Sequence, residues 1–287
     1  MKKVILLLML INFVFQPAYA WNVNSVSKFF NSDEKQIKRL LKSQVLYANK
    51  ENYPKFISTF ADYYKSGDGF NLDTYSKLIK DIWSTYDNIK YDIDIKDIAV
   101  SENKATVSLT EIASGKIGYS DVYKGELKSE SETIYYLEKI DNHWKVVSDF
   151  VKEENTSMLY GAARDLDIKL NAPKEINADT EYTATLEFTP PEETIAIASI
   201  ASDKVEYPQQ QTKEVFRTLP DDNILERMFT SNNENLNEYI VASIGLTKTS
   251  VTDTNINLNL TGFGYAITRV NVISQQENKK EITDEQN

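Results

Sequence analysis

The stretch from Ser131 to Phe150 reads SETIYYLEKIDNHWKVVSDF, and its pattern decides how the first half of the chain is interpreted. Two segments rich in β-branched and aromatic residues, 132–140 and 144–151, flank the dipeptide Asp141-Asn142. Asp and Asn favour tight turns because they tolerate positive φ and hydrogen-bond to their own backbone. The stretch therefore predicts a β-hairpin.

The same stretch carries His143, the one histidine of the chain. A general base must contact its substrate in a shielded site, where a third group usually orients it. A residue that follows a hairpin turn normally faces water, and the neighbouring Trp144 is a better buried anchor. We therefore expect His143 to be exposed and to have no catalytic role.

Three amphipathic helices are predicted upstream of the hairpin. Ser32 suits the N-cap of the first, Pro54 suits the first turn of the second, and the second ends at Gly67-Asp68-Gly69. The third has the clearest helical period. The apolar positions of the three helices are Ile37, Leu40, Leu41, Val45 and Ala48; Phe56, Ile57, Phe60, Ala61 and Tyr64; and Tyr75, Leu78, Ile79, Ile82, Trp83 and Tyr86.

The period changes to two between the third helix and the hairpin. Residues 89–96 and 105–110 alternate between apolar and polar side chains. Such alternation predicts strands of an antiparallel sheet with one face buried and the other in water.

This order of elements resembles the nuclear transport factor 2-like (NTF2-like) superfamily, also called SnoaL-like. In that superfamily three helices lead into a curved antiparallel sheet, and the closing hairpin is similar to YYLEKIDNHWKVVSDF. The resemblance covers about Ser32 to Lys152. It implies a cone in which the sheet wraps against the helices and can leave a pocket at its open end. The superfamily includes isomerases, dehydratases, hydrolases and many non-catalytic proteins, so the resemblance selects no activity.

The second half of the chain is read from its pattern alone. Residues 165–274 contain short alternating segments separated by turn residues, which is typical of an immunoglobulin-like β-sandwich. One exception is the segment 221–232, which fits a short helix through Ile224, Leu225, Met228 and Phe229. The predicted fold class is therefore α+β, with an NTF2-like cone followed by an all-β sandwich.

The boundaries follow from composition. We assign residues 1–20 to a signal peptide, 21–152 to the NTF2-like domain, 153–164 to a linker, and 165–274 to the sandwich domain. The remaining residues, 275–287, have little apolar content and are interpreted as a disordered tail.

The first residues, MKKVILLLMLINFVFQPAYA, have the three parts of a secretory signal peptide. Lys2 and Lys3 precede an apolar run from Val4 to Phe15, and Ala18-Tyr19-Ala20 supplies a cleavage site. The run is shorter than the roughly 20 apolar residues that span a membrane, and no later segment is apolar enough to do so. We expect cleavage after Ala20 and export to the periplasm or the extracellular space. The alternative is an uncleaved N-terminal anchor.

Composition excludes several classes of function. The chain has no cysteine, which removes disulfides, thiol nucleophiles and cysteine–metal sites. Its 43 acidic residues outnumber its 32 basic ones, for a formal net charge of −11. A field of that sign repels nucleic acid and anionic lipid, so neither is an expected partner. The abundance of Asn, Lys, Asp and Ile is typical of an AT-rich bacterial genome.

Carboxylates and tyrosines are the remaining candidates for chemistry. In enzymes of the superfamily, a pocket Asp or Glu often removes a proton while a Tyr or a second acid stabilises the oxyanion. The resemblance suggests that Asp62, Tyr63, Tyr64, Trp83, Tyr86, Glu111 and Tyr135 line the pocket. The Tyr/Asp set of the steroid isomerases and the His-Asp pair of the dehydratases find no match, so no catalytic residue is assigned. Aromatic side chains at helical spacing usually indicate a plain core, and that alternative is favoured.

The stretch Ser231 to Tyr239, SNNENLNEY, is rich in oxygen ligands that calcium could use. It lacks the Asp-x-Asp-x-Asp-Gly spacing of a calcium loop, which favours a polar surface loop. No glycine-rich phosphate loop is present. We therefore expect no metal site and no cofactor.

These observations leave three hypotheses. The first is an exported bacterial protein without catalytic activity, whose cone binds a small apolar ligand or dimerises and whose sandwich recognises an envelope partner. The alternative is an NTF2-like isomerase, dehydratase or hydrolase that uses a pocket carboxylate and a Tyr. The third is a structural role in the envelope, with the cone as the interface of a homodimer.

Overall fold

The structure is a computed structural model that describes residues 30–86, 88–118, 124–210, 214–251 and 256–274. The expected signal peptide and the expected disordered tail lie outside the described residues. No helix in the described part of the chain is both long enough and apolar enough to cross a bilayer.

The described residues form three α-helices, one 3-10 helix and twelve strands. The helices are α1 (Phe30–Ala48), α2 (Tyr53–Ile57), α3 (Leu72–Thr85) and the 3-10 helix η1 (Ala162–Asp165). The first strands are β1 (Lys90–Ser101), β2 (Lys104–Gly118), β3 (Lys124–Ile140) and β4 (His143–Gly161). The later strands are β5 (Lys169–Asn171), β6 (Glu175–Asn177), β7 (Glu181–Glu187), β8 (Ile195–Lys204), β9 (Arg217–Thr218), β10 (Ile224–Thr230), β11 (Glu238–Val251) and β12 (Ile256–Ile273).

The chain divides into two compact units. Unit 1 contains the residues up to 113 together with 130–152, and unit 2 contains 114–129 and the residues from 153 onward. Strands β2, β3 and β4 therefore contribute residues to both units. Each unit is described by itself below.

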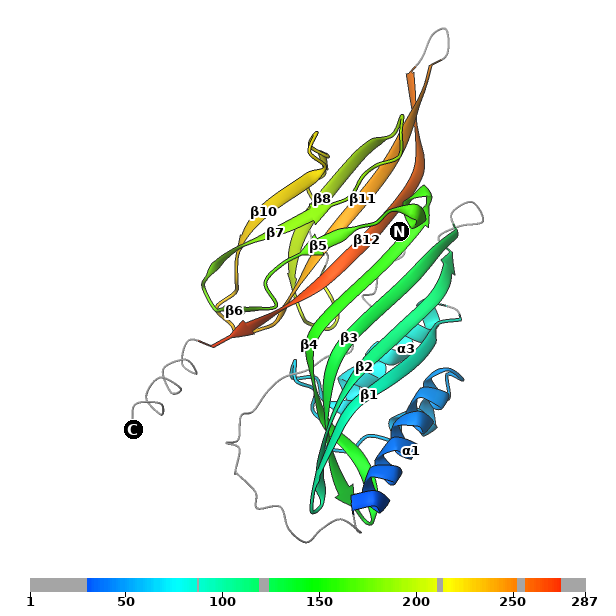
Figure 1. Ribbon diagram of the computed structural model, residues 1–287, viewed down its shortest axis with the longest axis vertical. Coiled ribbons are helices and arrows are strands. Elements are labelled where there is room, and N and C mark those ends of the chain that lie inside the picture. The colour runs from blue at the N-terminus through cyan, green and yellow to red at the C-terminus, as the bar shows by residue number, and fades with distance from the viewer. Residues whose placement is uncertain (1–29, 87, 119–123, 211–213, 252–255, 275–287) are drawn as a thin grey trace. The chain divides into compact units, whose positions relative to one another are not determined.

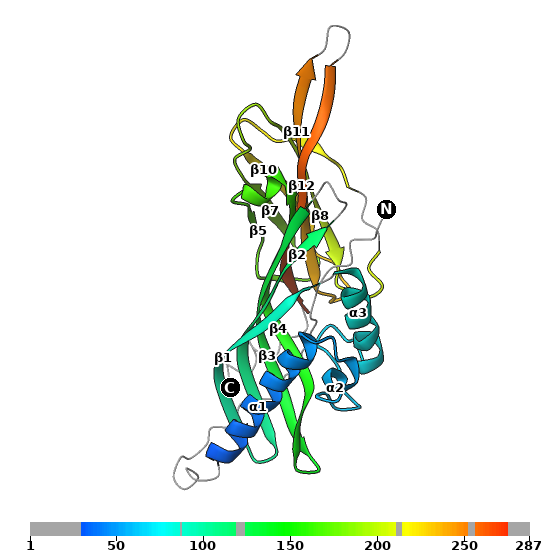
Figure 2. The same ribbon diagram turned by 90° about the vertical axis from the view of Figure 1, so that its right-hand side faces the viewer.

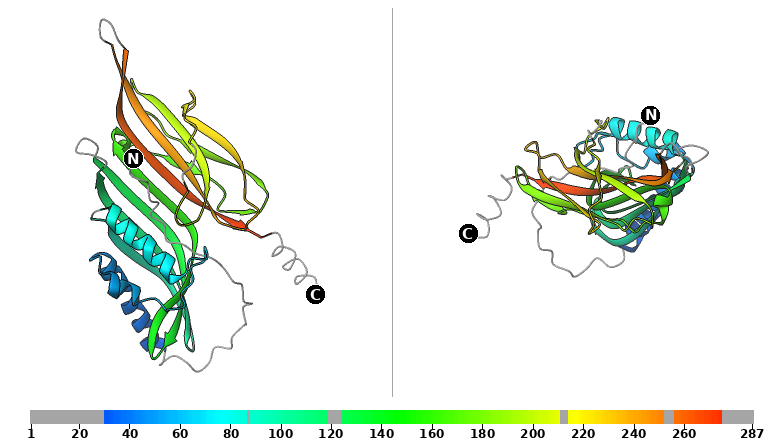
Figure 3. Two further views of the ribbon diagram at one scale, coloured as in Figure 1. Left: turned by 180° about the vertical axis from the view of Figure 1, so that it is seen from behind. Right: turned by 90° about the horizontal axis from the view of Figure 1, so that it is seen from above.

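Unit 1 has its helices on one face of its strands (Figures 2 and 3). The hairpin predicted from Asp141-Asn142 is confirmed: the two residues have φ of 47° and 63° and connect β3 to β4. Positive φ at both central residues matches the twist of a tight two-residue hairpin turn. The expected helix from Tyr75 onward is also confirmed as α3, which Asn71 caps by accepting a hydrogen bond from the Thr74 amide at 2.9 Å.

The segment that follows α2 covers one edge of β4 within unit 1. Val146 donates to the Thr59 carbonyl at 3.0 Å, and its own carbonyl accepts from the Ala61 amide at 2.9 Å. Because backbone hydrogen bonds hold this segment against β4, the side chain of Tyr64 is directed into the interior, where it is buried.

Unit 2 has one core between a three-stranded sheet, ordered β10-β7-β5, and the strands β8, β11 and β12. Strands β7 and β8 supply alternating buried side chains to it, such as Ala184, Leu186, Ala196 and Ala198. Figure 1 shows the strands of this unit in green (β5) through yellow (β10) to red (β12).

The expected fold class is wrong. The described chain is mostly β, and the strands of its second half do not form a separate immunoglobulin-like sandwich after a cone. Strands β12, β11, β8 and β9 follow β4 in a single strand order that begins with β1, β2 and β3. The stretch 153–161, expected to be a linker, is the second half of β4 and pairs with β12 from Asn155 to Gly161.

The reason lies in the side chains of β4. Alternate positions in its second half are buried, namely Glu154, Thr156, Met158 and Tyr160. Two of these four are polar, so the stretch lacks the apolar alternation that marks a strand in sequence. Pairing with a strand about 100 residues later in the chain supplies the backbone hydrogen bonds, and no local pattern encodes that partner.

The short helix expected within 221–232 is also wrong, because residues 224–230 form strand β10. This strand pairs antiparallel with β7, from Ile224 opposite Glu187 to Thr230 opposite Glu181. A short run with few apolar residues is compatible with either helix or strand, and strand pairing decides here.

Candidate functional site

The seven residues suggested by the resemblance divide into exposed and interior groups. Asp62 and Tyr63 lie at the surface, and Tyr63 is 60% exposed. Its hydroxyl donates to Glu138 at 2.6 Å, and this hydrogen bond raises the pKa of Tyr63 to about 12. Asp62 and Tyr63 therefore do not line an interior site.

Glu111 is the centre of a polar cluster inside unit 1. It lies on β2, and its carboxylate accepts from Tyr135 at 2.6 Å and from Thr133 at 2.9 Å, both on β3. Ser131, also on β3, provides a further hydrogen bond to Glu111. Part of the residue reaches the surface, but its carboxyl group is enclosed. The pair of Glu111 and Tyr135 brings an acid and a phenol into direct contact.

Asp149 forms a second acid–phenol pair on β4. It is 2% exposed, and its Oδ1 accepts from the Tyr64 hydroxyl at 3.0 Å. Both Asp149 and Glu111 act electrostatically on Tyr75 of α3, which lies buried between helix and sheet. The two pairs therefore belong to one interior cluster, which we call the acid–tyrosine cluster: Ser131, Thr133, Tyr135, Glu111, Asp149, Tyr64 and Tyr75.

Burial governs the titration of this cluster. It raises the pKa of Glu111 above its ordinary value of 4.5, although the hydrogen bonds from Tyr135, Thr133 and Ser131 oppose that rise. Burial is likewise the main reason why the pKa values of Tyr64, Tyr75 and Tyr135 lie well above 10, and the nearby carboxylates add to it. The phenols are therefore neutral hydrogen-bond donors at any ordinary pH.

Aromatic rings fill the space between the cluster and the helices. Tyr64 packs against Phe60 and Tyr75, with ring centroids 4.9 and 5.4 Å apart. Phe56 continues the row toward Trp83, with centroids 5.6 Å apart. Most of the interior aromatic residues expected on the helices thus form a packed row.

Trp83 and Tyr91 end this row with unmet polar atoms. Trp83 Nε1 and the Tyr91 hydroxyl are both buried, and neither has a hydrogen-bond partner of acceptable geometry among the described residues. Burial raises the pKa of Tyr91 to about 12, and a hydrogen bond from the adjacent Trp83 indole, too poor in geometry to satisfy either atom, partly opposes that rise. Tyr86, the other aromatic suggested near this point, is buried at the end of α3.

Sequence reasoning missed four residues that belong here. Ser131 and Thr133 precede Tyr135 at alternate positions of β3, so the alternation alone places them on the same face. Asp149 could not be found this way. The buried positions of β4 change from even to odd numbers between Val146 and Asp149. Tyr91 was placed in an alternating strand without any sign that its hydroxyl is enclosed.

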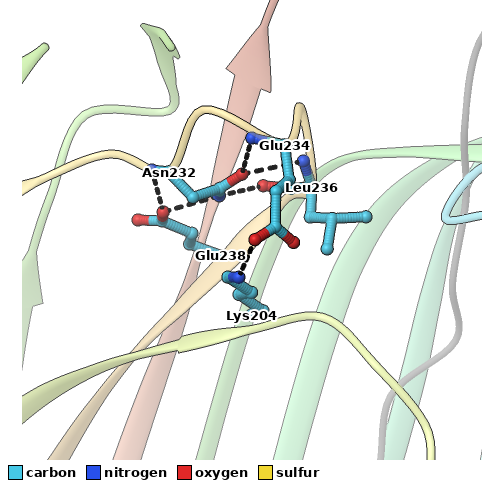
Figure 4. Close-up of polar contacts among 5 residues, drawn as sticks. All are labelled: Lys204, Asn232, Glu234, Leu236 and Glu238. Carbon is cyan, nitrogen blue, oxygen red and sulfur yellow. Dashed lines mark hydrogen bonds and ion pairs between the residues drawn. The ribbon is translucent and has the colours of Figure 1, made fainter. Parts of the chain in front are cut away.

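His143 is exposed at the hairpin tip, as expected, with Nδ1 2.8 Å from the Asp141 carbonyl. The described residues contain no group of three or more His, Asp or Glu that could hold a metal ion. The stretch Ser231 to Tyr239 forms a loop and the start of β11, and Figure 4 shows how its polar groups bond to one another.

The centre of that loop is Glu238, which is 3% exposed. Its Oε1 accepts from the backbone amide and the side-chain amide of Asn232, both at 2.7 Å. Its Oε2 accepts from Tyr182 at 2.6 Å and from Ser202 at 3.0 Å. Both oxygens are saturated by protein donors, so this carboxylate shapes the loop and has no free position for a cation.

The chain is similar to solved structures over less than half of its length. No family model matches the chain, and no curated protein matches it. Among solved structures, it is similar to Bd1075 of Bdellovibrio bacteriovorus at 16% identity and a TM-score of 0.36, over 44% of this chain and 42% of that one. It is also similar to a proposed dehydratase of the NTF2-like family from Streptomyces avermitilis, at 13% identity and a TM-score of 0.34, over 42% of this chain and 96% of that one.

A third similar structure is the Kfla4162 protein of Kribbella flavida, at 10% identity and a TM-score of 0.36, over 42% of this chain and 90% of that one. The chain thus spans less than half the length of the Bdellovibrio protein that it matches. One of the structures similar to part of the chain is thus an NTF2-like protein.

Proposed function

We propose that the chain is an exported, non-catalytic binding protein whose unit 1 takes up a small, largely apolar molecule. The observation that carries this proposal is the pair of unmet polar atoms, Trp83 Nε1 and the Tyr91 hydroxyl, beside a packed row of aromatic rings. Export is the expectation from residues 1–20 and belongs to the same proposal.

The two unmet polar atoms destabilise the free protein. A buried donor or acceptor without a partner destabilises a fold by about 1–3 kcal/mol. Native proteins contain few such groups, and each calls for an explanation. The neighbouring acid–tyrosine cluster shows that this interior otherwise satisfies its polar atoms, since Glu111 and Asp149 both accept from phenols. A ligand that hydrogen-bonds to Trp83 Nε1 and to the Tyr91 hydroxyl explains why the fold retains both groups.

The chemistry of the two groups limits the ligand. An indole N–H only donates, whereas a phenol can donate or accept. Around these two groups, a ligand would contact the faces and edges of Phe56 and other aromatic rings of the row. A flat molecule with one carbonyl or hydroxyl oxygen fits these groups. An anion does not, because burying an unpaired negative charge beside the carboxylates of Glu111 and Asp149 is costly.

The test uses Trp83→Phe and Tyr91→Phe, which delete the unmet atoms and keep most of the ring volume. We expect both variants to melt at a higher temperature than the unaltered chain, because a costly group has gone. We also expect both to lose most of the thermal stabilisation that 2-naphthol, a flat phenol, gives the unaltered chain. Tyr63→Phe is the matched control: its hydroxyl is at the surface, so we expect no rise in melting temperature and no loss of the stabilisation by 2-naphthol.

Three results would contradict the proposal. One is no stabilisation of the unaltered chain by 2-naphthol or by related ring ketones and alcohols. Another is equal stabilisation of all variants. The third is a large loss of stability in Trp83→Phe, which would mean that the indole N–H is already well bonded in the free protein.

A second candidate is an enzyme of the isomerase, dehydratase or hydrolase kind. The specific observation in its favour is the contact between Glu111, whose pKa is raised by burial, and the Tyr135 hydroxyl at 2.6 Å. Binding is favoured over catalysis because the Glu111 carboxylate already accepts hydrogen bonds from Tyr135, Thr133 and Ser131. Turnover of any ring ketone or alcohol by the purified chain, lost in Glu111→Gln, would reverse this preference.

A further inference from the structure

The helix α2 and its flanking residues border three other elements of unit 1, and hydrogen bonds hold two of these borders closed. Toward α1, the backbone amide of Asn52 donates to the Tyr47 carbonyl at 2.9 Å, and Gln44 Nε2 donates to Thr59 Oγ1 at 3.1 Å in the interior. Toward β4, the segment that follows α2 is bonded through its backbone, as described above. Opening either border would leave polar groups without partners.

The third border, between α2 and α3, is held differently, and we call it the α2–α3 seam. Within the described residues, no hydrogen bond joins Tyr53–Ile57 to Leu72–Thr85. The two helices meet through aromatic rings instead, since the ring of Phe56 lies 5.6 Å from that of Trp83 between centroids. Rings can separate without leaving a hydrogen-bond donor or acceptor unpaired, so this seam opens at a lower cost than the other two borders.

One polar contact closes the α2–α3 seam at the surface. Lys80 Nζ lies 3.9 Å from the centre of the Tyr53 ring. Lys80 precedes Trp83 by three positions on α3, and Tyr53 precedes Phe56 by three positions on α2, which places each pair on the same side of its helix. Lys80 is exposed and Tyr53 is half-buried, so they form the surface end of the seam. Figure 2 shows α2 beside α3.

Another route to Tyr91, from the side of α1, is closed by Asn49. This residue directly follows α1, and its side chain donates to the Tyr91 carbonyl at 2.8 Å and accepts from the Tyr91 amide at 2.9 Å. Opening this route would break both hydrogen bonds and leave part-buried backbone groups without partners. A molecule that reaches the Tyr91 hydroxyl therefore meets less resistance at the α2–α3 seam.

We propose that the α2–α3 seam is the entrance to the binding site of unit 1 and that Tyr53 and Lys80 form its gate. The inference rests on the proposed function, because it supplies the path by which a ligand reaches Trp83 Nε1 and the Tyr91 hydroxyl. Both atoms are buried, so a ligand meets them only after the packing around them has opened. A cation–π contact at an exposed position is weak, which lets thermal motion break it often.

The first experiment needs no ligand. Because Trp83 Nε1 is buried, its proton exchanges with deuterium only when the structure around it opens. Lys80→Ala removes the cation from the Tyr53 ring, so we expect the exchange of this indole proton, followed by NMR, to become about two- to fivefold faster. Lys77→Ala is the matched control, since Lys77 is an exposed lysine of the same helix, and its exchange rate should stay that of the unaltered chain. Equal rates in the two variants would overturn the gate.

The second experiment measures the kinetics of 2-naphthol binding by stopped-flow fluorescence. The gate is closed in both the free and the occupied protein, so Lys80→Ala should raise the association and dissociation rates by a similar factor and leave the Kd nearly unchanged. Lys77→Ala should change neither rate. A rise in the dissociation rate alone would overturn the gate, because it would mean that Lys80 contacts the bound molecule.

The third experiment closes the α2–α3 seam covalently. The chain has no cysteine, so a short bis-maleimide joins only cysteines that are introduced. We expect cross-linked Tyr53→Cys/Lys80→Cys to take up 2-naphthol far more slowly than the same protein before cross-linking. The matched control is Tyr47→Cys/Lys55→Cys, because Lys55 Nζ also lies over a ring, 5.7 Å from the centre of Tyr47, but joins α2 to α1. Its cross-linking should leave uptake unchanged.

Equal uptake of 2-naphthol by the two cross-linked proteins would overturn the α2–α3 seam as the entrance. A different failure is that the unaltered chain does not bind 2-naphthol or related ring ketones and alcohols at all. That result contradicts the proposed function, and the exchange of the Trp83 indole proton then still decides whether unit 1 opens at Tyr53 and Lys80.

Discussion

Each unit of the molecule buries a glutamate among hydroxyl donors, but the two surroundings differ in one respect. In unit 2, Glu238 accepts four hydrogen bonds from Asn232, Tyr182 and Ser202, and the network is complete. In unit 1, Glu111 is similarly bonded, yet the row of rings beside its cluster ends at Trp83 and Tyr91, whose polar atoms find no partner of acceptable geometry among the residues described. A complete network is explained by stability alone, whereas an incomplete one calls for a ligand.

The largest expected effect is on the complete network. Glu238→Ala leaves the donors of Asn232, Tyr182 and Ser202 buried and unpaired, so we expect a loss of about 3 kcal/mol in the free energy of unfolding. Urea denaturation measures it. Glu234→Ala is the control from the same loop, because its ion pair with Lys204 is exposed and such pairs contribute at most about 1 kcal/mol. Equal losses in the two variants would show that Glu238 does not hold the loop.

An intermediate effect is expected for two adjacent tyrosines. Tyr64→Phe removes a buried hydroxyl from Asp149 and should cost about 1–3 kcal/mol, because the carboxylate loses a donor inside the fold. Tyr63→Phe removes an exposed hydroxyl from Glu138 and should cost less than about 0.5 kcal/mol. Thermal and urea unfolding of both variants give the comparison. If the two losses were equal, burial would not be what distinguishes these bonds.

The smallest effect concerns pH. Because burial raises the pKa of Glu111 in the folded state, the folded protein binds a proton more readily at this site than the unfolded chain does. The site therefore makes the protein less stable as pH rises from 4.5 through the raised value, and the penalty remains above it. Glu111→Gln should remove this part of the pH dependence. The measurement is the difference in unfolding free energy between variant and unaltered chain at pH 4 and pH 7.

That difference should shift in favour of the variant at the higher pH. A shift of the opposite sign would mean that the hydrogen bonds from Tyr135, Thr133 and Ser131 outweigh burial and hold the carboxylate ionised.

Some of this architecture could be predicted from sequence and some could not. Local signals were sufficient for the turn at Asp141-Asn142 and for the period of α3. They failed along β4, where Glu154 and Thr156 occupy buried positions that a sequence pattern reserves for apolar residues. The partner of that segment is β12, and pairing over so long a separation leaves no trace in either strand alone.

The candidate site divides in a similar way. Tyr64, Glu111 and Tyr135 were singled out from a family resemblance and lie in the interior, whereas Asp62 and Tyr63 lie on the surface. These neighbours were expected on one helix, but α2 ends at Ile57 and the segment 59–65 is hydrogen-bonded to β4, which directs Tyr64 inward and leaves Tyr63 at the surface. The unmet atoms of Trp83 and Tyr91 could not be foreseen, since a sequence does not report which hydrogen bonds a fold leaves unmade.

The interleaving of the two units has a consequence for biogenesis. Residues 114–118 and 124–129 are synthesised between the two parts of unit 1 but belong to unit 2. The second half of β4 has to wait for residues 262–268 before it acquires its partner strand. Contacts so distant along the chain slow folding and prolong the exposure of unpaired strands. Unit 2 thus stays incomplete until residues 262–268 have emerged from the ribosome, and its unpaired strands are exposed until then.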